Sequence, residues 1–213
     1  MVEIMEMMPL MLEGMKTTLW VFFLTALFSI PLGMVACTLR LSRNRALQTL
    51  MQAYILVVRG TPLLLQLIFI YFGLPLVGVR LDREVAVVIA FVVNYAAYYT
   101  EIFRGGVLSI SLGQYEAAKV LGLSKFQTFF GIVLPQVVKR VLPPVGNELI
   151  TLVKDTSLVY VLGLGDVLRA AKTLSNKQAS LVPLFVAGLL YLLLIAAVTF
   201  FLKKTENRYD YYR

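Results

Sequence analysis

Charged side chains interrupt one of the long apolar stretches of this chain. Within residues 141–161, Glu148, Lys154 and Asp155 stand among aliphatic residues, and Ser157 follows them. Each ionisable group in an apolar membrane segment costs a few kcal/mol, so this segment would be a poor lipid-facing helix. It belongs in the protein interior against a polar cavity, where a broken backbone is also tolerated. These four side chains are therefore candidates for contact with a charged solute.

Two further polar side chains join this set. Arg59 precedes a Gly-Thr-Pro sequence in which Pro62 lacks a backbone N–H and interrupts a helix. Arg59 either contributes to a site or reaches towards lipid phosphates. Asn94 is placed to line a polar path or to join helices by hydrogen bonds. Glu101 and Arg104, at i,i+3 spacing, are predicted to pair with each other.

The residues on which most catalytic chemistry depends are missing from this sequence. It has no His and one Cys, which argues against histidine-dependent catalysis and excludes an internal disulfide. It has no G-x-x-x-x-G-K-S/T loop, no dinucleotide-binding fingerprint and no paired metal ligands. We therefore expect no catalytic residue, no metal site and no cofactor bound by this chain.

Composition places the candidate residues in a membrane. Of 213 residues, 59% are hydrophobic and 15% are charged, whereas soluble domains average about 45–50% and about 25%. Five apolar stretches approach the length of about 20 residues that a membrane-crossing helix needs. They run approximately over 17–39, 61–79, 85–103, 141–161 and 182–202. No linker divides them, so residues 1–213 are predicted to form a single all-α transmembrane domain.

The charge distribution predicts an orientation in that membrane. The chain carries 20 Lys and Arg residues against 12 Asp and Glu residues, a net charge of +8. The basic residues gather in the connectors at 40–45 and 104–140 and in the tail at 203–213, whereas the N-terminal tail is acidic. Connectors rich in Lys and Arg face the cytoplasm. We therefore expect the N-terminus outside, the C-terminus inside, five crossings and no nucleic-acid partner.

The connector between the third and fourth crossings is predicted to fold as a helical hairpin. Residues 111–114 and 124–127 each place a Ser three positions before a Gln, the spacing of a capping box. Gly122 suits the left-handed conformation that ends a helix, and the second helix is expected to stop near Pro135. The apolar stripe of this second helix packs either on the chain's own helices or on a partner.

One motif in the hairpin is specific. Its seven positions are Glu116, Ala117, Ala118, Gly122, Ile132, Leu134 and Pro135. Gaps of three and nine residues separate its blocks, which is the spacing of the EAA motif. The region 111–135 therefore resembles the coupling region of the membrane subunit of ABC importers. The resemblance implies that these seven residues dock on a separate ATP-binding subunit, which would bind ATP and Mg.

The resemblance covers nearly the whole chain, from about residue 14 to residue 202. Further matching segments are 59–66, 98–106, 134–136 and 146–158. They look like those of the polar amino acid permeases, a family that includes histidine, arginine, glutamine and cystine importers. One departure is the pair Tyr98-Tyr99, which alters either a pocket or helix packing. The resemblance implies the type I ABC importer permease fold in the bacterial cytoplasmic membrane.

The resemblance also implies a mechanism of alternating access. An extracellular binding protein would deliver a polar amino acid, and the hairpin would carry the closure of two ATPases to the membrane helices. Five crossings are few for enclosing a path, so a second permease chain, identical or paralogous, is expected. The predicted pathway residues are Arg59, Asn94, Glu148, Lys154, Asp155 and Ser157. Lys154 and Asp155 would neutralise the two charges of the amino acid, unless they pair with each other or with the opposite subunit.

Two other classes remain open on the residues. An ion-coupled secondary amino acid transporter also places charges in broken helices. It does not need the capped hairpin, and it usually has inverted repeats, which this sequence does not display. A membrane-embedded scaffold would not need Glu148, Lys154 and Asp155.

Overall fold

The computed structural model describes residues 2–208, and no β-strand occurs among them. The all-α prediction is confirmed for this range, and Arg213 of the basic tail lies outside it. In chain order the elements are α1 (Val2–Arg40), α2 (Arg45–Gly60), α3 (Leu63–Ile68), the π-helix η1 (Phe69–Gly73), the 3-10 helix η2 (Leu74–Val77), α4 (Arg83–Leu108), α5 (Leu112–Val120), α6 (Lys125–Thr128), the π-helix η3 (Phe129–Val133), α7 (Leu134–Asp155), the 3-10 helix η4 (Thr156–Leu162), α8 (Val167–Gln178) and α9 (Val182–Arg208).

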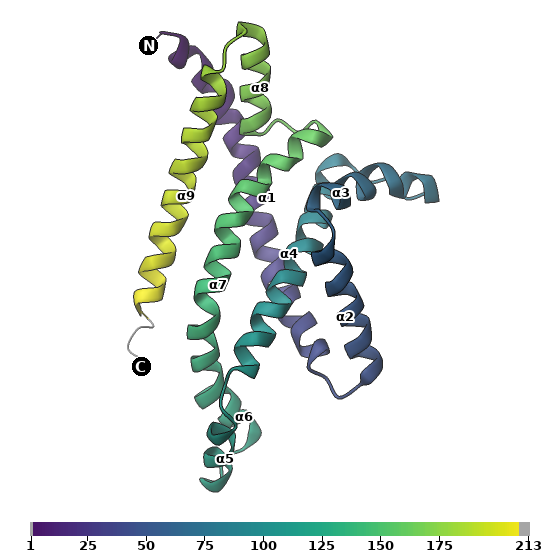
Figure 1. The fold of residues 1–213 in the computed structure, drawn as a ribbon, viewed down its shortest axis with the longest axis vertical. Helices are drawn as coiled ribbons and strands as arrows, with labels where there is room; N and C mark the ends of the chain where they lie inside the picture. Colours follow the sequence, from purple (N-terminus) through teal and green to yellow (C-terminus); the bar gives the residue numbers. More distant parts are fainter. Residues whose placement is uncertain (1, 209–213) are drawn as a thin grey trace.

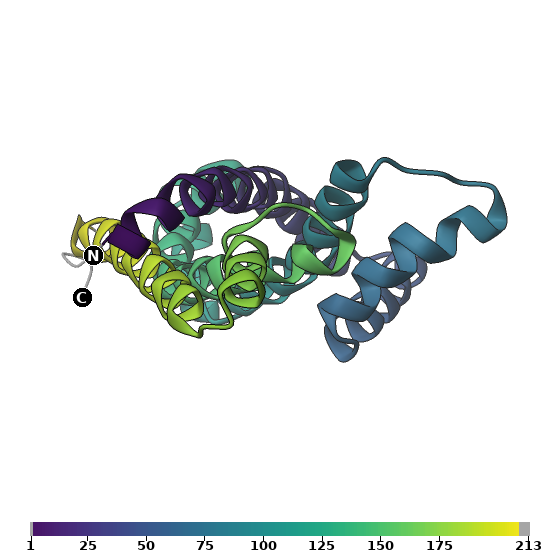
Figure 2. The same ribbon diagram turned by 90° about the horizontal axis from the view of Figure 1, so that it is seen from above.

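The long helices lie side by side, with the α5–α6 hairpin at one end and α8 at the other (Figure 1). α1 packs along α4, and α7 lies between α4 and α9. Seen from above, α2 and α3 extend away from the remaining helices on one side (Figure 2). The N-terminus lies at the end opposite to the hairpin.

Three helices, α1, α4 and α9, are each long and apolar enough to cross a membrane. α2 and the segment Leu63–Val77 meet the same criterion only as a bent pair. The described part of the chain therefore has three or four apolar spans. The remaining predicted crossing, 141–161, falls on α7 and η4, whose ionisable residues set it apart from the apolar helices.

The second predicted crossing, 61–79, is not a single helix. The chain turns through 104° between α2 and the segment Leu63–Val77, so the interruption predicted at Pro62 is confirmed. The segment before the interruption, which lies outside the predicted crossing, forms α2, a helix of 16 residues that packs beside α4. Thr61 and Pro62 both have extended backbone. At Thr61 the cause is the following proline, which disfavours a helical conformation at the residue before it.

α1 and α4 approach closely at Gly33. A Cβ atom at this residue would lie 2.6 Å from Cβ of Tyr99 and 3.1 Å from the carbonyl oxygen of Ala96. Both atoms are fixed to the backbone of α4 and cannot rotate away. Small residues at a helix crossing let two backbones approach, and here this contact holds α4 in place along α1.

Gly33→Val is expected to destabilise the protein by about 2–3 kcal/mol, because α1 and α4 would have to separate. Thermal unfolding in detergent, followed by size-exclusion chromatography, measures the effect. Gly188→Val on α9 is the matched control, since a Cβ atom there meets no atom within 4 Å. Equal unfolding temperatures for the two variants would contradict the close contact.

A buried carboxylate fixes the turn that follows η4. Asp166 accepts hydrogen bonds from the backbone N–H groups of Leu168 at 3.0 Å and Arg169 at 3.1 Å, and from the Tyr191 hydroxyl at 3.2 Å. Burial raises the pKa of the Asp166 carboxyl, while these hydrogen bonds lower it. Asp166 thereby caps α8 and joins it to α9, which anchors the end of η4.

Candidate functional site

A cavity of about 620 Å³ lies between the α2–α3 break, α4 and α7. Its charged, amide and aliphatic hydroxyl side chains are Arg59, Thr61, Asn94, Glu148, Thr151 and Asp155. Four of the six predicted pathway residues, Arg59, Asn94, Glu148 and Asp155, therefore line one space. They come from three elements that are distant in the sequence.

α7 supplies the acidic wall of this cavity. Glu148, Thr151 and Asp155 follow one another at i, i+3 and i+7, the spacing that places side chains on one face of a helix. The sequence prediction omitted Thr151, although its spacing to the two carboxylates would have found it. The polar residues that make α7 unsuitable for lipid thus face the cavity.

Tyr95 of α4 holds one of the two carboxylates. Its hydroxyl donates a hydrogen bond of 2.8 Å to Oδ2 of Asp155. The Tyr95 ring is buried and stacked on Phe91, with an interplanar angle of 11°. Tyr95 was not predicted as a site residue, because the contact joins residues 60 positions apart. The orientation of Asp155 is thus set by a rigid side chain from another helix.

Arg59 provides a positive charge in the cavity wall. Its guanidinium carbon lies 4.9 Å from the centre of the Tyr98 ring, a cation–π distance. Glu148 is attracted by Arg59 and repelled by Asp155. Of the aromatic pair singled out in the sequence, Tyr98 lines the cavity and Tyr99 is buried in the core. With two carboxylates against one guanidinium, the wall complements a cation.

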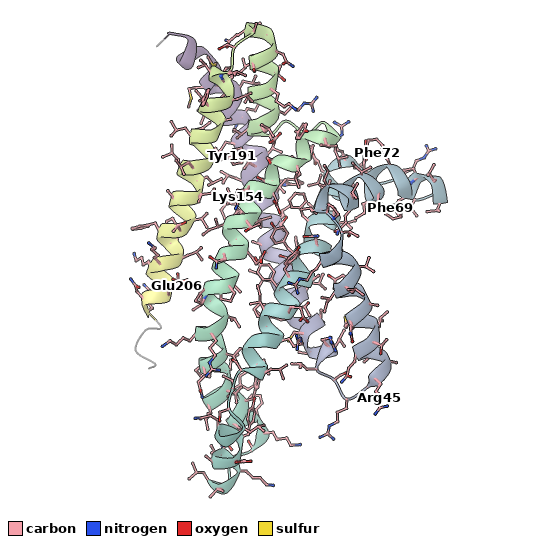
Figure 3. The ribbon with its side chains drawn as sticks, in the orientation of Figure 1. Arg45, Phe69, Phe72, Lys154, Tyr191 and Glu206 are labelled. Carbon is pink, nitrogen blue, oxygen red and sulfur yellow. The ribbon has the colours of Figure 1, made fainter. Side chains whose placement is uncertain are left out.

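Lys154 and Ser157 do not line this cavity. They line a second one of about 310 Å³ that also borders Tyr191 of α9, and Figure 3 shows Lys154 on the α9 side of α7. Consecutive residues of an α-helix point about 100° apart, so Lys154 and Asp155 face different spaces. The geometry therefore does not support their joint neutralisation of one amino acid, and Arg59 is the basic residue that lines the same cavity as Asp155.

The α2–α3 break is held by side chains that replace missing backbone hydrogen bonds. The Thr61 hydroxyl donates to the Val57 carbonyl at 2.8 Å, and Nε2 of Gln66 donates to the Val58 carbonyl at 2.7 Å. Nδ2 of Asn94 in turn donates to Oε1 of Gln66 at 3.0 Å, which ties the break to α4. Gln66 was not predicted as a site residue. Its position four residues after Pro62, about one helical turn, could have indicated a side chain that bonds the break.

Glu101 and Arg104 form the intrahelical ion pair predicted from their spacing. Nε and one terminal nitrogen of Arg104 donate to the two oxygens of Glu101 at 2.9 Å and 2.6 Å. Each charge is thus matched within α4. The pair lies outside the cavity lining.

The α5–α6 hairpin has the predicted turn and one complete capping box. Gly122 has φ +73° and ends the turn after α5 in the left-handed region. The Ser124 hydroxyl accepts from Gln127 N, and the Gln127 side chain accepts from Ser124 N. Ser111 caps α5 by accepting from Gly113 N, so the predicted reciprocal contact with Gln114 is not formed.

The second hairpin helix does not stop near Pro135, contrary to the prediction. α6, η3 and α7 continue one another, and Pro135 occupies the first turn of α7. Pro135 follows the π-helical turn η3, where the α-helical hydrogen-bond pattern is already interrupted. A helical backbone therefore runs from the hairpin to Asp155, over about 45 Å at 1.5 Å per residue.

The EAA motif divides into an exposed part and an internal part. Glu116, Ala117 and Gly122 are exposed, Ala118 is buried, and Ile132, Leu134 and Pro135 are half-buried. Beside the exposed part, large apolar side chains face outwards: Val120 is 87% exposed, Leu121 73% and Phe126 70%. The hairpin thus presents an apolar surface at one end of the molecule.

Residues 29–211 match the family described as the binding-protein-dependent transport system inner membrane component. The arginine transport system permease protein ArtQ of Bacillus subtilis is 41% identical over 202 residues, which cover 94% of this chain and 92% of that protein. The glutamine transport system permease protein GlnP of Escherichia coli is 36% identical, with coverage of 94% and 93%.

Solved structures also share the fold. A chain in the crystal structure of an amino acid ABC transporter with histidines has a TM-score of 0.90 and 30% identity, and 97% of each chain is covered. A chain of the MetNI methionine ABC transporter in an inward-facing conformation has a TM-score of 0.78 and 20% identity, covering 96% of this chain and 98% of that one. The second likeness concerns the fold alone. The predicted fold class is confirmed.

Proposed function

The chain belongs to the family of binding-protein-dependent transport system inner membrane components, and from this premise we propose that it is the membrane subunit of an ABC importer for a polar amino acid. The resemblance found in the motifs is thereby confirmed for the family. The arginine and glutamine permeases among its relatives support amino acid import, and these relatives give no support to the ion-coupled alternative.

The cavity supports a cationic amino acid as the substrate. Its wall carries Glu148 and Asp155 against the single guanidinium of Arg59. An amino acid with a basic side chain brings two positive charges and one carboxylate, so each of its charges finds an opposite one. Arg59, Asn94, Glu148 and Asp155 are the pathway residues of this proposal. Lys154 and Ser157 remain predicted pathway residues in the neighbouring cavity.

The hairpin supports docking of a separate ATP-binding subunit, which binds ATP and Mg and performs the hydrolysis. Its exposed apolar side chains, together with Glu116 and Ala117, form the contact surface. The basic connectors support a cytoplasmic position for this end, with the N-terminus outside the bacterial cytoplasmic membrane and the C-terminus inside. A binding protein delivers the substrate at the outer end. A second permease chain, identical or paralogous, completes the path.

The continuous backbone from the hairpin into α7 supports coupling by alternating access. When the ATP-binding subunits close, they displace the hairpin, and α6, η3 and α7 transmit this movement along one helical segment. Glu148 and Asp155 are carried on the same segment. The displacement therefore changes the acidic wall of the cavity relative to Arg59 and Asn94, which belong to other helices.

Reconstitution with the ATP-binding subunit and the binding protein tests this function. Proteoliposomes that contain ATP are expected to accumulate L-arginine, and a protonophore should leave the rate unchanged. Uptake without ATP that collapses on addition of the protonophore would contradict the proposal and favour ion coupling.

A further inference from the structure

The amide of Gln66 replaces a backbone N–H that the chain lacks. In a continuous helix the N–H of residue 62 would donate to the carbonyl of residue 58, but Pro62 has no N–H. Nε2 of Gln66 donates to this same Val58 carbonyl at 2.7 Å. The Gln66 side chain therefore satisfies the carbonyl that the proline leaves without its helical partner.

This contact fixes which end of the Gln66 amide faces the break. The carbonyl oxygens of Val58 and Thr61 can only accept hydrogen bonds. The Thr61 hydroxyl donates to Val57, so its oxygen also accepts, and it lies 2.8 Å from Nε2 of Gln66. Three acceptors thus surround the nitrogen end. A rotated amide would place oxygen against oxygen, so Oε1 must point away from the break.

The same constraint passes to Asn94. Oε1 of Gln66 can only accept, so Asn94 must donate through Nδ2, as the contact of 3.0 Å requires. Asn94 lines the cavity and is 4% exposed. Among the hydrogen bonds of the described residues it uses only Nδ2, so its own oxygen is left to a ligand.

We propose that Gln66 is a positioning residue that fixes the Asn94 amide, so that Asn94 presents a hydrogen-bond acceptor to the ligand in the cavity. This inference rests on the proposed function. Asn94 Oδ1 then acts with the carboxylates of Glu148 and Asp155, and all three are acceptors. The selected ligand groups are N–H donors: an ammonium, a guanidinium or an amide nitrogen.

Gln66→Met tests the positioning role. Tritiated L-arginine is titrated onto the permease assembled with its ATP-binding subunit in nanodiscs, without binding protein, so that the membrane cavity alone is measured. Without the Gln66 oxygen, the Asn94 amide can rotate and present its nitrogen to the ligand. Affinity should fall about 5-fold to 10-fold, the effect of one hydrogen bond. Gln48→Met on α2, the helix before the break, is the control, because its amide donates to the Ser42 carbonyl and neither residue lines the cavity.

The Asn94→Leu background separates positioning from support of the bend. Leucine has no acceptor that Gln66 could orient towards the ligand. In this background Gln66→Met should change L-arginine affinity less than 2-fold. Equal losses in both backgrounds would mean that Gln66 only supports the break, and would overturn the inference.

Asn94→Leu alone tests the inference even if Gln66→Met fails to fold. It removes the acceptor, while the hydrogen bonds of Gln66 to Val58 and Thr61 do not involve residue 94. Unchanged L-arginine affinity in this variant would overturn the inference. If the wild type binds L-glutamine instead of L-arginine, the proposed cationic substrate is wrong. The same cycle then applies to L-glutamine, whose amide N–H groups need the same acceptor. Binding of neither amino acid by the wild type would overturn both proposals.

Discussion

Leu121→Asp is expected to abolish association with the ATP-binding subunit, and with it all ATP-driven transport. Leu121 caps the end of α5 beside the turn at Gly122 and is 73% exposed. If the hairpin seats in a groove of the partner, this side chain becomes buried there. A carboxylate in an apolar contact loses its hydration without gaining a counter-charge, which costs several kcal/mol. We expect a loss of at least about 100-fold in affinity for the partner.

Co-purification of the two subunits and arginine-stimulated ATPase activity measure this effect. Leu181→Asp is the matched control, because Leu181 is 65% exposed in the turn before α9, at the opposite end of the molecule. The control should assemble like the wild type. An intact, stimulated complex with Leu121→Asp would show that the hairpin is not the docking surface.

The hairpin could be predicted from the sequence because its determinants are local. The Ser124–Gln127 capping box and the left-handed turn at Gly122 depend on residues within a few positions of one another. The stop at Pro135 was wrong for an equally local reason. Proline usually interrupts an α-helix, but a π-helical turn before it lets the helical backbone continue, and the sequence pattern does not distinguish the two. The structure has the π-helical turn η3 before Pro135, so the hairpin continues into α7.

The cavity was only partly predictable, because tertiary packing decides its lining. Spacing along α7 identified Glu148 and Asp155 as polar interruptions, and their common face follows from helix geometry. The partners of these groups come from elsewhere. Arg59 reaches Tyr98, and Tyr95 reaches Asp155, across long stretches of sequence. Lys154 lines a second cavity, because consecutive helical residues point about 100° apart, and its role in the pathway stays a prediction.

The combined variant Glu148→Gln/Asp155→Asn is expected to weaken L-arginine binding by about 100-fold or more. Both changes preserve shape, and the asparagine oxygen can still accept the Tyr95 hydroxyl. Only the two negative charges disappear, which leaves Arg59 as the charge in the cavity wall. A unit charge pair about 4 Å apart in a partly buried site interacts by about 4 kcal/mol before desolvation is counted. Desolvation offsets most of this energy and leaves about 1.4 kcal/mol for each charge, so each single variant should lose about 10-fold in affinity.

Titration of the nanodisc assembly with tritiated L-arginine and L-glutamine measures this change in selectivity. L-Glutamine, whose side chain is uncharged, should lose less affinity than L-arginine, so the ratio of L-arginine affinity to L-glutamine affinity should fall. Asp82→Asn, at the exposed start of α4, is the matched control and should bind like the wild type.

Lys154→Met distinguishes the two interpretations of α7. If the bound amino acid lies between Lys154 and Asp155, Lys154→Met should weaken binding as much as Asp155→Asn. If Arg59 is the partner cation, Lys154→Met should leave binding unchanged. An unaltered selectivity ratio in the combined variant would remove both carboxylates from substrate recognition.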